Sequence, residues 1–177
     1  MNSANYWIDK LALKHIDLGG FFGSAFASNE ITLSAALPER FNGDRRYYSS
    51  NYYLLQDSEV LFLHRLNQDE MWFFHTGSAV KIHIFSDAGI YKVVTLGIGI
   101  DKGESLQVVA PHNHWFGAEL VLPNSFILAS CSLSPGFDIR DSAQPITEEI
   151  MSLKKLFPDH ISLIDRLTGC VNNIPKL

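Results

Sequence analysis

The chain has 177 residues, of which 46% are hydrophobic and 12% aromatic, and it carries a net charge of −5. This length fits one domain with a sizeable core, and the composition is too apolar for a disordered chain. Because the basic residues are scattered and no apolar run reaches membrane-spanning length, we expect neither nucleic acid nor a membrane as a partner.

The N-terminal residues predict a short helix. Ser3 can cap it, and Trp7, Ile8 and Leu11 then face one side. No signal-peptide pattern is present. Cys131 lies far from the second cysteine, Cys170, and outside any paired ligand spacing, so we expect reduced thiols and a cytoplasmic location.

The middle of the chain reads as a series of short strands. Turn signals recur about every 9 to 12 residues, between runs rich in Val, Ile, Phe, Tyr and Leu, and leave no room for intervening helices. In residues 80–85 apolar side chains alternate with Lys81 and His83, as a strand with two different faces requires. The pattern predicts an all-β sandwich or barrel.

The C-terminal part predicts two further helices. Pro145 can open the first, and Asp159 can cap the second, which Gly169 ends. The first has an apolar stripe that consists of Ile146, Ile150, Leu153, Leu156 and Phe157. We therefore expect one domain, 1–177, with a barrel core at about 20–140 and a helical appendage at about 145–169 on its outside.

Two neighbouring strands predict a polar pocket. A period of two puts Phe62 and His64 on one face of the strand at 62–66, and Glu70 and Trp72 on one face of the returning strand. His114 would be a third contributor from a later strand. An imidazole and a carboxylate within an aromatic wall suit a general base or a metal.

These residues resemble the motifs of the cupin superfamily. His64, Glu70 and Gly77 match its first motif, whereas Leu66 stands where a second histidine would be. In the second motif the proline is present, but Phe116 occupies the position of the histidine ligand.

The chain is more closely similar to a cupin family of unknown function, through segments that run from about residue 11 to 138. These segments are Gly-Gly-Phe-Phe at 19–22, Tyr-Leu-Leu at 53–55, His64 with Asp-Glu-Met-Trp at 69–72, Leu-Gly at 96–97, Gln-Val-Val-Ala-Pro at 107–111, Trp-Phe-Gly-Ala at 115–118 and Cys-Ser-Leu-Ser-Pro-Gly-Phe at 131–137. The resemblance implies a double-stranded β-helix, the cupin jelly roll, commonly a homodimer, with a pocket inside the barrel.

Two positions depart from that family's pattern. Leu18 stands where a glutamate is expected before the double glycine, and Ala27 where an arginine is expected after it. Either the ligand differs from the family's usual one, or His15 and Asp17 take over the role through a local shift.

The candidate site follows from these patterns. His64 and Glu70 are the candidate catalytic residues, and the candidate ligand-binding residues are His64, Glu70, Trp72, His114, Phe116, Tyr53 and Gln107. We expect no cofactor; if a divalent metal binds, its expected ligands are His64, Glu70 and His114, fewer firm ligands than such metals usually take. His64 could equally be a structural side chain that is hydrogen-bonded inside the barrel.

Four functional hypotheses remain open. The leading one is a homodimeric cupin that binds a polar small molecule, carbohydrate-like or nucleotide-like, inside the barrel. The second is a sugar or sugar-nucleotide isomerase or epimerase with His64 as the base and Tyr53 or His114 as the acid. The others are a metal-dependent oxygenase or isomerase, and a structural dimer with a vestigial pocket; in such a dimer, residues 20–34 would pair with the sheet of the partner subunit.

Overall fold

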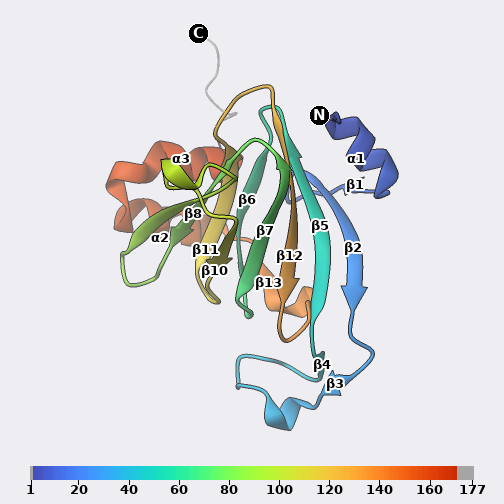
Figure 1. Cartoon of the computed structure of the whole chain (residues 1–177). Coiled ribbons are helices and arrows are strands. Elements are labelled where there is room, and N and C mark those ends of the chain that lie inside the picture. Colours follow the sequence, from blue (N-terminus) through green and yellow to red (C-terminus); the bar gives the residue numbers. More distant parts are fainter. Residues whose placement is uncertain (1, 171–177) are drawn as a thin grey trace.

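Two antiparallel β-sheets packed face to face form the body of the protein (Figure 1). The structure is a computed structural model that describes residues 2–170. The larger sheet contains, in spatial order, β1 (Lys14–His15), β2 (Phe21–Ala27), β5 (Ser49–Gln56), β12 (Phe126–Leu133), β7 (Glu70–Gly77) and β10 (Gln107–Ala110). The smaller sheet contains β13 (Ser142–Ala143), β6 (Val60–Leu66), β11 (Trp115–Leu120), β8 (Val80–Phe85) and β9 (Tyr91–Leu96).

Consecutive strands alternate between the sheets along much of the chain. From β5 to β8 each strand leaves one sheet and enters the other, and β11 and β12 do the same. This alternation is the jelly-roll arrangement, because every turn wraps the chain around the core instead of extending one sheet. The predicted all-β fold with short terminal helices is confirmed.

The main apolar core lies between the two sheets. In β8 the side chains of Val80, Ile82 and Ile84 enter this core, as the alternation of residues 80–85 predicted. On the opposite face of the same strand Lys81 is exposed, but His83 is buried. That face is therefore covered rather than open.

The cover is a helical layer formed by α2 (Thr147–Leu156) and α3 (Ile161–Leu167), which lies against the outer side of the smaller sheet (Figure 1). A second apolar cluster joins them, and it consists of Leu63, Phe85, Trp115, Leu153, Phe157, Ile164 and Leu167. The predicted cap at Asp159 is wrong, because Pro158–His160 forms a 3-10 turn and His160 precedes α3 without a side-chain cap bond. Gly169 follows the helix with φ +70°, the left-handed conformation typical of a helix end.

The N-terminal helix α1 (Ala4–Lys10) lies at the other side of the molecule, near β1 and β2 (Figure 1). Its predicted cap is confirmed, since the Ser3 hydroxyl accepts a hydrogen bond of 3.3 Å from the amide of Tyr6. Within residues 2–170, none of the helices has the length and apolarity needed to span a bilayer.

The segment between β2 and β5 leaves the sheets as an excursion. It contains a two-stranded ribbon, β3 (Ile31–Thr32) and β4 (Arg45–Arg46), and one 3-10 turn at Ser34–Ala36. Figure 1 shows this excursion at one end of the sandwich, where it meets the chain that follows β12.

Candidate functional site

A cavity of about 520 Å³ lies inside the jelly roll. Strands β2, β5, β6, β7 and β12 contribute to its wall, together with residues 16–18 and the segment 137–144. Its polar or titratable lining residues are Asp17, Ser24, Ser49, Ser50, Asn51, Tyr53, His64, Glu70, Trp72, Cys131, Ser142 and Gln144. His64, Glu70, Trp72 and Tyr53, four of the seven residues that the sequence indicated, are thus brought to one cavity.

A β-bulge in β6 turns His64 toward the cavity. Phe116 of β11 pairs with His64 of β6, and Ala118 of β11 pairs with Leu61 of β6. Three residue steps along β6 therefore lie opposite two steps along β11. Leu61, His64 and Leu66 all line the cavity as a result. The prediction that Phe62 shares their face is wrong, because strict alternation fails at the extra residue.

The His64 imidazole is neutral and has one free nitrogen. The side chain is buried, and its Nδ1 lies 2.9 Å from the carbonyl oxygen of Phe62. Since a carbonyl only accepts, Nδ1 donates and Nε2 is left as an unprotonated acceptor, for which residues 2–170 provide no hydrogen-bond donor. Burial lowers the pKa of His64 to about 4. The ring packs against Phe116 with centroids 4.1 Å apart.

Glu70 lies on the opposite sheet in a group of side chains from three adjacent strands. Cys131 of β12 pairs with Trp72 of β7 on one side and with Asn51 of β5 on the other, and Leu133 pairs with Glu70. The Trp72 indole Nε1 donates a 2.9 Å hydrogen bond to Glu70 Oε2. This register keeps the carboxyl in the cavity wall.

Burial controls the ionisation of this group. It raises the pKa of Glu70 to about 7, although the Trp72 indole and the Cys131 thiol beside the carboxyl act in the opposite direction. Burial also raises the pKa of the Cys131 thiol, and the nearby Glu70 adds to that effect. At neutral pH the carboxyl is thus poised between its two forms, whereas the thiol is protonated.

Tyr53 is hydrogen-bonded to the loop that precedes β2. Its hydroxyl donates a 2.7 Å hydrogen bond to the carbonyl oxygen of Gly19, and its ring meets Trp72 edge-on with centroids 5.3 Å apart. Burial raises the pKa of Tyr53 well above its ordinary value. A tyrosine whose hydroxyl proton is already donated to a carbonyl oxygen and whose pKa is raised is a poor general acid.

Three predicted site residues lie outside the cavity wall. His114 is half-buried in the turn before β11, with Nδ1 2.9 Å from the carbonyl oxygen of His112. Gln107 is exposed on β10, opposite Phe73. Phe116 is fully buried behind His64 and reaches the site only through that ring.

The donor set expected for a metal is not assembled. Within residues 2–170 no three His, Cys, Asp or Glu side chains gather closely enough to hold a metal ion. His64 and Glu70 share the cavity, but His114 does not line it. The residues present therefore do not fit a cupin metal centre of this composition.

The departures near the double glycine have different structural outcomes. Asp17 is exposed and lines the cavity, which places it at the entrance. His15 instead pairs with Glu59, with Nε2 2.7 Å from Oε1. Leu18 lines the cavity with an apolar side chain, whereas Ala27 is exposed and does not line it.

Sequence reasoning missed several polar residues of the wall. Asn51 could have been found, because it lies two residues before Tyr53 on the same strand and so shares its face. Ser142 and Gln144 had no comparable signal, since they follow the last long strand and reach the cavity only through tertiary packing.

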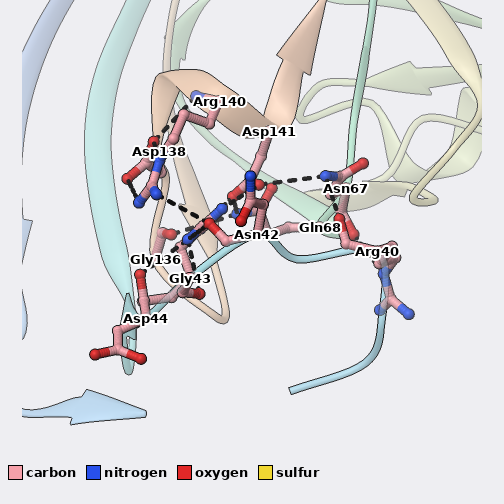
Figure 2. Close-up of polar contacts among 11 residues, drawn as sticks. Arg40, Asn42, Gly43, Asp44, Asn67, Gln68, Gly136, Asp138, Arg140 and Asp141 are labelled. Atoms are coloured by element: carbon pink, nitrogen blue, oxygen red, sulfur yellow. Dashed lines mark hydrogen bonds and ion pairs between the residues drawn. The ribbon is translucent and has the colours of Figure 1, made fainter. Parts of the chain in front are cut away.

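A buried polar network fixes the wall segment 137–144 (Figure 2). Arg45 binds Asp141 through two hydrogen bonds of 2.7 Å, and the two side chains are 1% and 0% exposed. Arg45 Nη1 also lies 2.9 Å from the carbonyl oxygens of residues 42, 43 and 44, and Gln68 donates to Asp141 at 2.6 Å. The network thus ties the excursion and the β6–β7 turn to the segment that carries Phe137, Ser142 and Gln144.

Comparison with known proteins gave one family match. The model of the cupin superfamily family DUF985 matches residues 5–144. No curated protein sequence matched the chain.

Solved structures give the same picture. A Shewanella oneidensis protein is 32% identical with a TM-score of 0.81, and the match covers 95% of this chain and 98% of that one. A hypothetical protein from Leishmania major is 28% identical with a TM-score of 0.80 and coverages of 93% and 98%. An oxalate decarboxylase from Lactobacillus farciminis, in a formate complex, shares the fold at 12% identity and a TM-score of 0.51, over 96% of this chain and 43% of its own.

The family match spans most of the chain and agrees with the jelly roll, the His64 strand and the Glu70 strand described above. The chain therefore belongs to the cupin superfamily, in the family DUF985.

Proposed function

We propose that this cupin binds a small polar organic molecule in the cavity between its sheets. The observation that carries the proposal is the composition of the wall: a few convergent polar groups, with His64 and Glu70 deep inside, among largely apolar side chains. A volume of about 520 Å³ is in the range of small-molecule sites. Trp72 and Tyr53 supply flat surfaces against which a ring can pack.

The wall favours a carbohydrate-like ligand over a nucleotide-like one. Among the described residues, neither lysine nor arginine lines the cavity. Phosphate groups are usually bound by such cations or by the N-terminus of an α-helix, and the wall consists of strands, loops and one residue of a 3-10 turn. Serine, asparagine and glutamine side chains, in contrast, suit the hydroxyl groups of a sugar or polyol.

A retention experiment tests the proposal. Purified protein is incubated with a metabolite extract, separated from free compounds and examined by native mass spectrometry and thermal shift. We expect wild type to retain a small molecule, Glu70→Gln and His64→Gln to bind it at least about tenfold more weakly, and His112→Ala to behave as wild type. His112 is a matched control because its side chain is exposed, outside the cavity, and bound to Asp69. Retention of nothing, or equal retention by all variants, would contradict the proposal.

A second candidate function is an isomerase or epimerase, and the ionisation of Glu70 favours it. A group with a pKa near the working pH is the most effective general acid or base. Glu70, with a pKa of about 7, meets that condition better than His64, with a pKa of about 4. Solvent deuterium exchange into keto-sugars tests this function: wild type should exchange and Glu70→Gln should not, and absence of exchange by wild type would count against it.

The unpaired edge of β2 supports a homodimer. Among residues 2–170, β1 pairs only with Phe21 and Phe22 of this edge, so the far end of β2 has no strand partner in that part of the chain, and Phe26 there is 70% exposed. Free edges of this kind pair with other strands, and two copies of the same edge are self-complementary about a twofold axis. Sedimentation velocity at micromolar concentration should give a dimer, and a monomer would refute this part of the proposal.

A further inference from the structure

Three hydrogen-bond donors of the cavity wall are used inside the protein. Trp72 donates to Glu70, Tyr53 donates to the carbonyl of Gly19, and His64 Nδ1 donates to the carbonyl of Phe62. These three side chains would otherwise be the obvious donors to a bound molecule. With their protons committed, they offer a ligand either aromatic surface or, for His64, only an acceptor.

The wall also carries acceptors that face the cavity. His64 Nε2 is an acceptor without a protein partner among residues 2–170, on a side chain that is 96% buried and lines the cavity. The Glu70 carboxyl is a second acceptor, although the Trp72 indole donates to Oε2 and the Cys131 thiol is also hydrogen-bonded to the carboxyl. The Asp17 carboxylate at the entrance is a third. A ligand that satisfies such a site must bring donors of its own.

The charge of the wall also favours a ligand that brings hydrogen-bond donors, in particular a cationic one. The wall contains two carboxyl groups, Asp17 and Glu70, of which Glu70 is poised between its two forms at neutral pH, and no lysine or arginine among the described residues balances them there. The chain as a whole carries −5. An aromatic corner formed by Trp72 and Tyr53 adds an environment that attracts cations. An ammonium group brings three donors and one positive charge, which matches these acceptors and the carboxyl groups.

We propose that the cavity selects ligands that carry a protonated amine together with hydroxyl groups, the chemistry of an amino sugar or an amino polyol. The amine binds among the carboxyl groups and His64 Nε2, and the hydroxyl groups bind Asn51 and the serines of β5. This inference rests on the proposed function, since it names the ligand class of the same cavity.

The test compares ligands that share a hydroxyl framework and differ in charge. Glucosamine, glucose and glucuronate form one such set, and the galacto and manno sets supply the alternative stereochemistry. Dissociation constants are measured at pH 7 by calorimetry or ligand-observed NMR. In at least one set we expect the amine to bind at least about tenfold more tightly than the uronate, with the neutral sugar between them.

Two variants locate the selectivity. Asp17→Asn should reduce the ratio of amine to neutral-sugar affinity by about threefold or more, because it removes the charge at the entrance. Asp87→Asn, in the exposed turn after β8, removes the same charge outside the cavity and should leave that ratio as in wild type.

The outcomes separate this inference from the function on which it rests. Uronates that bind as tightly as amines would overturn the ligand class and leave the binding function intact. The same holds if none of the nine sugars binds while wild type retains another molecule from the extract. If neither the sugars nor any extract component binds, both proposals fail.

Discussion

Replacing Glu70 with glutamine should make the protein more stable at neutral pH and change how stability depends on pH. The carboxyl is buried, with 8% of the residue exposed, and its pKa rises from an ordinary 4.5 to about 7 in the folded state. Glutamine keeps the size of the side chain and an oxygen that can accept from Trp72, but it has no proton to lose. The substitution therefore isolates the ionisation of one group.

The direction in which stability changes with pH depends on whether the folded or the unfolded state retains the Glu70 proton. Below pH 4.5 the carboxyl is protonated in both states and costs nothing. Between pH 4.5 and about 7 the unfolded chain releases its proton while the folded protein retains it, so stability falls as pH rises. Each pKa unit corresponds to about 1.4 kcal/mol, so the full loss is about 3 kcal/mol above pH 7.

Urea denaturation of both proteins from pH 4.5 to 8 measures this directly. The free energy of unfolding of Glu70→Gln minus that of wild type should increase by about 3 kcal/mol across the range. Glu148→Gln serves as the control, because Glu148 is exposed on α2 and its carboxyl stays in water in both states. A difference for Glu70→Gln as flat as the control's would show that the carboxyl is not held neutral by burial.

Ionisation of His64 changes stability with pH in the direction opposite to that of Glu70. Its pKa falls from 6.5 to about 4 on folding, so the unfolded chain takes up a proton first as the pH drops, and stability falls between pH 6.5 and 4. In wild type this loss runs against the gain from Glu70 over much of the same interval. In the same urea denaturation series, the free energy of unfolding of wild type should thus change less with pH in that interval than that of Glu70→Gln or that of His64→Gln.

Three further predictions concern the scaffold of the site. Asp141→Ala should lower the free energy of unfolding by about 3–5 kcal/mol in urea denaturation, because it leaves the buried Arg45 guanidinium unpaired; a loss under 1 kcal/mol would contradict this. Gly19→Ala should cost more than about 2 kcal/mol, since a Cβ there would lie 2.0 Å from the Val60 carbonyl oxygen at φ +94°, whereas Gly103→Ala, with open space at φ +81°, should cost about 1 kcal/mol; equal losses would refute the steric argument. Leu153→Ala should cost about 2–4 kcal/mol in a single cooperative transition, because the helical layer and the smaller sheet share one apolar cluster; a separate early transition in thermal unfolding would show that the layer unfolds independently.

Much of the fold could be predicted from the sequence because its information is local. Turn residues bound the strands, and the alternation in residues 80–85 gave the correct inward face. The alternation failed at Phe62 because the bulge depends on the pairing of β6 with β11, which joins residues more than fifty positions apart. The cap at Asp159 failed because Pro158 begins a 3-10 turn, which places Asp159 inside that turn and leaves His160 as the residue before α3.

The candidate site divides in the same way. His64 and Glu70 were predictable from spacing, because His64 shares its face with Leu66 and Glu70 shares its face with Trp72, on two strands that flank one short turn. His114 was not, because it precedes β11 and its side chain turns back to the carbonyl of His112. Gln144 reaches the wall on a segment that is held by the pairing of β13 with β6 and by Asp141, which is bound to Arg45 almost one hundred residues earlier in the chain. No local pattern encodes a contact of that range.

The position of Leu18 connects these observations to the chemistry of the cavity. A glutamate expected there by resemblance would have added a carboxylate next to Asp17, and an arginine at Ala27 would lie on the free edge of β2 rather than in the wall. The two departures therefore do not balance in charge inside the cavity. Leucine at position 18 removes one negative charge from the wall, whereas alanine at position 27 changes the charge outside the wall. Asp17 and Glu70 are then the acidic groups left to set the charge of the wall, so single neutral substitutions at these two positions have a larger effect on charge selectivity here than in a cavity with several acids.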